Sequence, residues 1–184
     1  LMESRVVKPD NWDIENHKYF KKIFTWNDTL IDNKKYFKIN YTHKIPENIE
    51  FNLDKKEKLC VMINSNKFSD HPLELYTERI RAINWFEKNH PEDFDLYGFG
   101  WDKYVFKGVL KKLNRLEIIS KMLAPKHKCL RFPAPAKTVL PKYKFAICYE
   151  NARDIPGYIT EKIFNCFFAG CVPIYLGAPN ITDY

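Results

Sequence analysis

Apolar residues in the second part of the chain follow two patterns that alternate along the sequence. Short, nearly continuous apolar runs predict buried strands at 59–63, 94–97, 145–149 and 172–176. Apolar residues spaced by three and four predict helices at 73–89, at 110–123, and between Thr160 and Gly170. Strands that alternate with helices predict an α/β fold with a parallel sheet.

The pattern changes near residue 58, which suggests a domain boundary. Residues 1–45 have mixed periodicity and resemble the end of a preceding domain, and residues 46–58 form a charged connector that ends in DKKEK. We therefore expect an incomplete domain at 1–45, a linker at 46–58, and an α/β domain at 59–184.

The amino-acid composition sets only broad limits on the fold and on the function class. The chain has 184 residues, a formal net charge of +7 and 45% hydrophobic residues, enough for one buried domain or parts of two. The excess of Lys suits a phosphate-bearing ligand or an anionic membrane surface. No apolar run reaches the roughly 18 to 20 residues of a membrane span, and the N-terminus lacks a signal-peptide pattern.

The cysteines indicate a reducing compartment. They are odd in number and lack C-x-x-C spacing, and we interpret them as reduced core residues: Cys60, Cys129, Cys148, Cys166 and Cys171. We expect a cytoplasmic protein, or one peripheral to the cytoplasmic membrane, if the source is bacterial. A eukaryotic source would place it in the Golgi lumen.

A polar cluster at 150–162 is the strongest candidate site. Glu150 and Asn151 end a strand, and a Pro- and Gly-containing loop leads to a helix that starts after Thr160. The free N–H groups and the dipole of a helix start favour an anion, and Lys162 adds a positive charge. Glu161 can accept hydrogen bonds from sugar hydroxyls. An ordinary solvated helix start would account for Thr-Glu-Lys equally well.

The 73–89 helix contains a second site candidate, which involves two arginines. Arg79 shares a helical row with Ile83 and Phe86, so it should lean toward the core. Arg81 falls on the row of Thr77, Asn84 and Lys88, which is the solvated side.

The strings YKFAICYEN and GYITEKIFNCFFAGCVPIYLG closely resemble the donor-sugar motif of the α1,3-fucosyltransferase family. The resemblance implies GDP-fucose as donor, inversion at the anomeric carbon, and the GT-B architecture of two Rossmann-like domains facing a cleft. It also implies that Asn151, Tyr158, Glu161 and Lys162 contact the nucleotide sugar. An Arg early in the preceding helix should contact the diphosphate; helical phase favours Arg79, and Arg81 stays open.

The same resemblance assigns a general base near the N-terminus. The family has a Glu before a Val/Pro/Asn pattern, and MESRVVKPDNWD matches it loosely, which places the base at Glu3. An acidic residue near a chain end is otherwise an ordinary mobile surface charge.

We expect no metal and no other cofactor. Asp93 and Asp95 spell D-x-D, but two carboxylates are too few for a convincing Mg²⁺ or Mn²⁺ site, and the histidines lack ligand spacing.

Together these features predict transfer of fucose from GDP-fucose to an acceptor glycan hydroxyl, α1,3-linked and of N-acetylglucosamine type. The acceptor would be a lipopolysaccharide or a glycoprotein glycan, with peripheral membrane association and no nucleic-acid partner. In this reading, 1–45 ends the acceptor-side domain and 59–184 is a donor domain incomplete at its C-terminus, so both ends of the chain look cut. The alternatives are a GT-B transferase with another nucleotide-sugar donor and a non-catalytic basic binding module.

Overall fold

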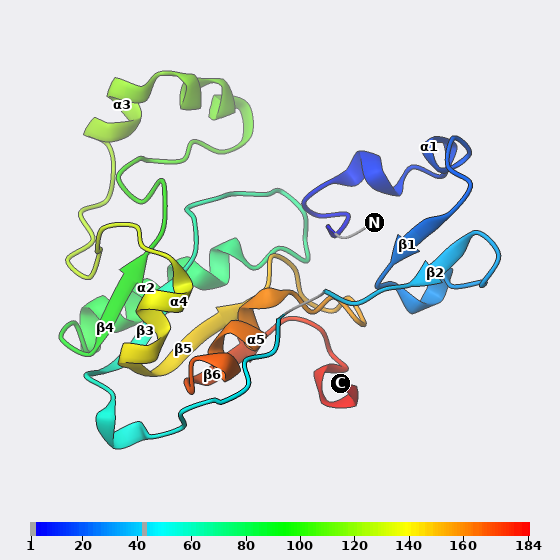
Figure 1. Ribbon diagram of the computed structural model, residues 1–184. Helices are drawn as coiled ribbons and strands as arrows, with labels where there is room; N and C mark the ends of the chain where they lie inside the picture. The colour runs from blue at the N-terminus through cyan, green and yellow to red at the C-terminus, as the bar shows by residue number, and fades with distance from the viewer. Residues whose placement is uncertain (1–2, 42–43) are drawn as a thin grey trace.

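The structure, a computed structural model, describes residues 3–41 and 44–184 and contains two parallel sheets (Figure 1). The smaller sheet pairs β1 (Ile23–Thr25) with β2 (Tyr36–Lys38). The larger sheet has the order β4-β3-β5-β6, and all of its neighbouring strands are parallel. Its strands are β3 (Lys58–Ile63), β4 (Phe94–Tyr97), β5 (Tyr143–Tyr149) and β6 (Val172–Leu176).

Helices connect the strands of the larger sheet. The α-helices are α1 (Ile14–His17), α2 (Tyr76–Asn89), α3 (Glu117–Met122), α4 (Ala136–Val139) and α5 (Glu161–Phe168). Short 3₁₀ helices cover Pro9–Trp12, Asp28–Leu30, Leu53–Lys55, Gly108–Arg115, Leu140–Lys142 and Ile181–Asp183. The predicted parallel α/β sheet is thus confirmed, and each strand of the larger sheet lies within two residues of its expected bounds, whereas β1 and β2 were not predicted.

Two helix predictions need correction. The expected helix at 110–123 is a 3₁₀ helix over Gly108–Arg115 followed by the short α3, because its apolar side chains have no core surface to pack against: Val109, Leu110, Leu116 and Ile118 are all exposed. In α5 the apolar residues at helical spacing that predict the helix are Ile163, Phe164, Phe167 and Phe168, but Phe167 is exposed and the buried residues are Ile163 and Cys166.

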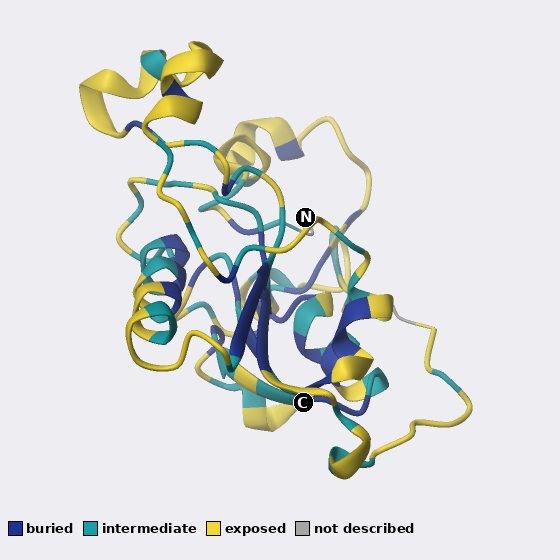
Figure 2. Cartoon of the chain, turned by 90° about the vertical axis from the view of Figure 1, so that its left-hand side faces the viewer, coloured by how far each residue is buried: buried dark blue, intermediate teal, exposed yellow. Residues whose placement is uncertain are grey.

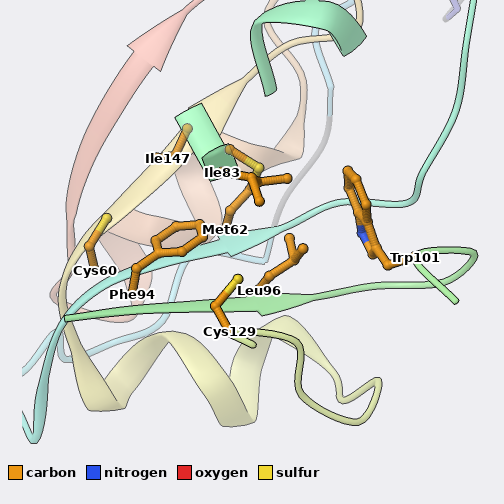
Figure 3. Packing of buried hydrophobic residues seen from close by; sticks show 8 residues of the cluster. All are labelled: Cys60, Met62, Ile83, Phe94, Leu96, Trp101, Cys129 and Ile147. Atoms are coloured by element: carbon orange, nitrogen blue, oxygen red, sulfur yellow. The ribbon is translucent and has the colours of Figure 1, made fainter. Parts of the chain in front are cut away.

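The larger sheet is covered on both faces, since alternate residues of its strands point into two different clusters. On one face, Ile83 of α2 packs with Met62 and with the other side chains shown in Figure 3: Cys60, Phe94, Leu96, Trp101, Cys129 and Ile147. On the other face, Val61 packs with Val139 and with Cys166 of α5. The five cysteines are free and buried, as expected.

The N-terminal part of the chain packs against the end of β5. Trp26 and Tyr158 are both fully buried, and their ring centroids lie 5.1 Å apart. Val6 and Trp12 pack on the same cluster. Residues near the start of the chain therefore lie beside the loop that follows β5, although they are distant in sequence (Figure 1).

The predicted linker crosses the C-terminal end of α5. Lys56 donates a hydrogen bond to the Ala169 carbonyl at 2.8 Å. The next residue, Gly170, has φ +58°, and a Cβ there would lie 2.1 Å from the Glu50 carbonyl oxygen, so only glycine fits. The division at 45 and 58 stays a prediction.

Within the described residues, no helix has both the length and the apolar character needed to cross a membrane.

Candidate functional site

The strand order places a pocket at the carboxyl ends of β3 and β5. The chain passes from β3 to β4 on one side and then returns to β5 on the other, so the strand order reverses between β3 and β5. In open α/β sheets, ligands bind outside the carboxyl ends of the strands at such a reversal. A cavity of about 380 Å³ lies there, between Asn64 and Ser65 after β3 and Cys148 and Asn151 at the end of β5.

Arg79 reaches this pocket from the first turns of α2. Its side chain is 2% exposed, as its helical phase predicted. One guanidinium nitrogen, Nη2, donates to the Tyr149 carbonyl at 2.9 Å, to the Glu150 carbonyl at 2.7 Å, and to Asn151 Oδ1 at 3.0 Å. These bonds tie α2 to the end of β5 and hold the guanidinium rigidly against the pocket.

No carboxylate of the described residues lies within ion-pair distance of Arg79. Among residues 3–41 and 44–184, it forms no ion pair, and its buried Nε has no hydrogen-bond partner. Burial lowers the pKa of Arg79, and the negative charges of Glu150 and Glu74 partly offset this effect. A buried, unpaired cation beside a cavity favours an anion in that cavity.

Arg81 has a different environment. Its Nη1 bonds to Glu78 Oε1 at 2.6 Å, and its side chain is largely exposed, so it does not line the pocket. Of the two arginines, the structure brings Arg79 to the site.

A buried carboxylate fixes the start of α5. Glu150 is fully buried and accepts hydrogen bonds from the Thr160 N–H and hydroxyl, each at 2.7 Å, and from Lys162 Nζ at 3.0 Å. Lys162 Nζ also donates to Thr160 Oγ1 at 2.7 Å. Thr160 occupies the predicted N-cap position, but its side chain does not cap α5 because its hydroxyl is bound to Glu150. This network sets the direction of the Lys162 side chain.

The first two residues of α5 line the pocket. Lys162 is mostly buried, whereas half of the Glu161 side chain is exposed, and Glu161 Oε1 lies 3.9 Å from Lys162 Nζ. Lys162 thus faces two carboxylates, whereas Arg79 has no ion-pair partner within the described residues and Lys67 adds a further positive charge to the pocket lining. The free N–H groups at the start of α5 add to the positive potential.

Glu3, Asn151 and Tyr158 form a second group of hydrogen-bonded side chains at the pocket. The Asn151 amide donates to the Tyr158 hydroxyl at 3.3 Å, and that hydroxyl donates to Glu3 Oε2 at 3.4 Å. Glu3 and Asn151 line the cavity. Tyr158 is fully buried and is not among the residues that line the cavity, and its hydroxyl bonds to both of the other side chains; its contact with the nucleotide sugar stays a prediction.

Sequence reasoning missed the residues that follow β3. Asn64, Ser65 and Lys67 line the pocket, but none of them is among the candidate residues that the sequence suggests. The position just after a parallel strand was the available signal, because carboxyl ends of neighbouring strands meet at one edge. Glu150 was noted as a strand end, but its burial could not be read from its neighbours in the sequence.

The D-x-D pair lies away from this pocket, at the start of β4. Asp95 is buried and bonds Lys58 Nζ at 2.6 Å, Arg131 Nη2 at 2.6 Å and the Tyr143 hydroxyl at 2.5 Å. Asp93 is about half exposed and points to His90. Over the described residues, no group of three or more His, Cys, Asp or Glu side chains is arranged to hold a metal.

Comparison with known proteins shows which protein family this chain matches. Residues 53–184 match the family described as glycosyltransferase family 10 (fucosyltransferase), C-terminal part. An alpha-(1,3)-fucosyltransferase of Helicobacter pylori is 45% identical over 43 residues, which are 23% of this chain and 9% of that protein. A GDP-fucose protein O-fucosyltransferase 3 of Xenopus laevis is 46% identical over 46 residues, 25% of this chain and 10% of that protein. The matched segments thus span about a tenth of these relatives.

A solved structure agrees with the fold. A crystal structure of an alpha1,3-fucosyltransferase with GDP has a TM-score of 0.50 and 17% identity to this chain, and the match covers 91% of this chain and 50% of the other. The parallel sheet with helices on both faces is therefore an α/β fold of the GT-B type. Because the family match covers well over half of its length, the chain belongs to glycosyltransferase family 10, the fucosyltransferases.

Proposed function

We propose that this chain forms the donor-binding part of a fucosyltransferase that moves fucose from GDP-fucose to a hydroxyl of an acceptor glycan. The main support for this proposal is the environment of Arg79. In the described part of the chain, Arg79 is a buried cation without an ion-pair partner, and it lines a pocket at the strand-order reversal. A diphosphate would supply the missing negative charge. Charge-assisted hydrogen bonds to phosphate contribute roughly 1.5 to 3 kcal/mol each.

The pocket provides groups for each part of the donor. Arg79 and Lys162 bind the diphosphate, with help from the N–H groups at the start of α5. The Glu161 carboxylate accepts hydrogen bonds from the hydroxyls of ribose and fucose, and the Asn151 amide can both donate to them and accept from them. Tyr158 acts as a positioning residue through its bonds to Asn151 and Glu3.

We propose Glu3 as the general base of an inverting transfer. The acceptor oxygen forms a bond to the anomeric carbon of fucose while the bond from that carbon to the phosphate oxygen breaks, and GDP leaves with the electron pair. The acceptor hydroxyl proton passes to the Glu3 carboxylate. The positive charges of Arg79 and Lys162 stabilise the negative charge that develops on GDP. No step needs a metal in this scheme.

The acceptor follows from the family resemblance rather than from the pocket. We propose an N-acetylglucosamine-type residue, α1,3-linked in the product, on a lipopolysaccharide or glycoprotein glycan. We propose that the protein is located in the cytoplasm or on the cytoplasmic membrane surface if the source is bacterial, and in the Golgi lumen if it is eukaryotic. The buried, unpaired cysteines suit the reducing cytoplasm.

A thermal-shift panel tests the donor assignment. We expect GDP to raise the melting temperature of the protein more than UDP does at equal concentration, because ligands that bind the native state stabilise it. A single-stranded oligonucleotide should leave the melting temperature unchanged. A larger shift with UDP would indicate a transferase with another donor, and a shift with the oligonucleotide alone would indicate a binding module.

A further inference from the structure

Residues 107–128 form a projecting segment, here named the basic lobe, that the proposed reaction does not use. It contains the 3₁₀ helix Gly108–Arg115 and the helix α3. The lobe extends away from the larger sheet at the top of Figure 1, and most of it is coloured as exposed in Figure 2. It is large enough to act as a separate contact surface.

The basic lobe exposes large apolar side chains to solvent. Val109 is 96% exposed, Ile118 is 77% exposed and Met122 is 80% exposed, and Leu110 and Leu123 are also exposed. Single exposed apolar residues are common on soluble proteins, but several on one short projecting segment indicate a binding surface.

The basic lobe also holds most of the net charge of the chain. Its sequence, KGVLKKLNRLEIISKMLAPKHK, has seven Lys and Arg residues and one acid, Glu117, which gives +6 of the total +7. That acid is already bound to Lys103 Nζ at 2.7 Å. The surface that the lobe presents is therefore both apolar and strongly cationic.

Polar contacts at its base hold the basic lobe in a defined shape. The Asn114 side chain accepts from the Phe106 N–H at 2.8 Å and donates to the Phe106 carbonyl at 3.0 Å. The Tyr104 N–H donates to the Ser120 carbonyl at 2.7 Å. Polar groups thus close the base of the lobe, while Ile118 and Met122 remain exposed.

We propose that the basic lobe docks on the surface of a bilayer that contains anionic lipids. The Lys and Arg side chains would contact the headgroups, and Val109, Ile118 and Met122 would enter the boundary between headgroups and acyl chains. Lipid fits this surface better than nucleic acid does. The exposed apolar residues are aliphatic, and residues 107–128 contain no Phe, Tyr or Trp on which bases could stack.

The position of the basic lobe relates the membrane to the candidate site. Lys107, at the start of the lobe, has its Nζ 4.6 Å from the Phe68 ring centroid. Both residues line a hollow that also contains Lys67, and Lys67 lines the pocket of Arg79 and Lys162 as well. A membrane-bound lobe would therefore hold the site close to glycans carried by that membrane.

Vesicle flotation tests this proposal without any measurement of transfer. We expect the protein to float with vesicles of phosphatidylcholine and phosphatidylglycerol, and to stay unbound with phosphatidylcholine alone. Raising the salt concentration should weaken binding, because it screens the headgroup charge. Equal binding to both vesicles, or binding to neither, would overturn the proposal, as would binding to single-stranded RNA with no binding to vesicles.

Two pairs of matched variants locate the surface. Lys111→Glu/Lys112→Glu should reduce vesicle binding at least tenfold, whereas Lys21→Glu/Lys22→Glu, the same charge change on exposed lysines elsewhere, should have a much smaller effect. Ile118→Ser/Met122→Ser should also reduce it, whereas Ile14→Ser/Ile45→Ser, at similarly exposed positions, should not. Equal losses from the lobe variants and their controls would show that the contact lies elsewhere.

Discussion

The carboxylate of Glu150 and the ammonium group of Lys162 lie 3.0 Å apart, and the carboxylate is fully buried. The pair joins the end of β5 to the first turn of α5, and the Thr160 N–H and hydroxyl complete the set of donors to Glu150. Glu150 therefore positions Lys162 from behind the pocket, and a change at Glu150 should affect both folding and the ligand.

We expect Glu150→Gln to lower the free energy of unfolding by about 2 kcal/mol, since hydrogen bonds to a charged group are worth roughly 1.5 to 3 kcal/mol each. Urea unfolding at pH 7 measures this change. Glu161→Gln is the matched control, because half of the Glu161 side chain is exposed, and it should have little effect on stability. Equal stability of the Glu150 variant and the wild type would show that the network does not hold the fold.

Glu3→Gln should reduce transfer by about 10² to 10⁴ in a full-length protein, the usual contribution of general-base catalysis. The affinity for GDP should hardly change, because the base acts on the acceptor. Radiolabelled fucose transfer measures the first effect, and titration with GDP measures the second. Glu15→Gln removes an exposed carboxylate from the same part of the chain and serves as the control. Near-normal turnover in Glu3→Gln would place the base elsewhere.

Chelation tests the proposed metal independence. GDP affinity and turnover should be unchanged in EDTA, because Asp95 is already bound to Lys58, Arg131 and Tyr143, and Asp93 points to His90. Loss of turnover in EDTA that Mn²⁺ restores would contradict this prediction and show that the D-x-D pair binds a metal with the substrate.

Stability should fall in alkaline solution. Burial raises the pKa of the Cys60 and Cys129 thiols to about 12 from an ordinary value of 9.0, and a contact with Glu87 adds to the effect at Cys129. Groups with raised pKa values stabilise the folded state fully below their unfolded pKa and lose this contribution as pH rises toward the folded value. Urea unfolding with a reductant should therefore show lower stability at pH 10.5 than at pH 8.

Cys60→Ala separates the thiol from other alkaline effects. This variant should be less stable at pH 8 because it loses buried volume, yet it should lose less stability between pH 8 and pH 10.5 than the wild type does. An equal loss in both proteins would assign the alkaline effect to other groups, such as Tyr143, whose pKa is also raised by burial and by its bond to Asp95.

The sequence could predict those parts of the fold that depend on local pattern. The β3 strand is a continuous apolar run, and Arg79 shares a helical row with Ile83, so both were visible from spacing alone. The prediction of one helix at 110–123 was wrong. The apolar spacing there is helical, but the apolar side chains are exposed to solvent and do not pack on the core.

Some residues of the site could not be predicted from the sequence, because their positions depend on contacts between segments that are distant in the chain. Asn64 and Ser65 line the pocket only because β3 pairs with β5 in the sheet. The sequence of neither strand predicts this strand order. Tyr158 is fully buried, since Trp26, far away in the sequence, packs against its ring. The motif located the site, and tertiary packing decided which side chains face the cavity.

The measurement that tests the account most directly is the dissociation constant of GDP, compared with that of guanosine, for the wild type, Arg79→Ala and Arg81→Ala. We predict that Arg79→Ala weakens GDP binding at least tenfold and leaves guanosine binding unchanged, because it removes the buried cation opposite the diphosphate. Arg81→Ala should bind both ligands like the wild type, since Arg81 pairs with Glu78 on the surface. Unchanged GDP affinity in a folded Arg79→Ala protein would contradict the assignment of this pocket to the diphosphate.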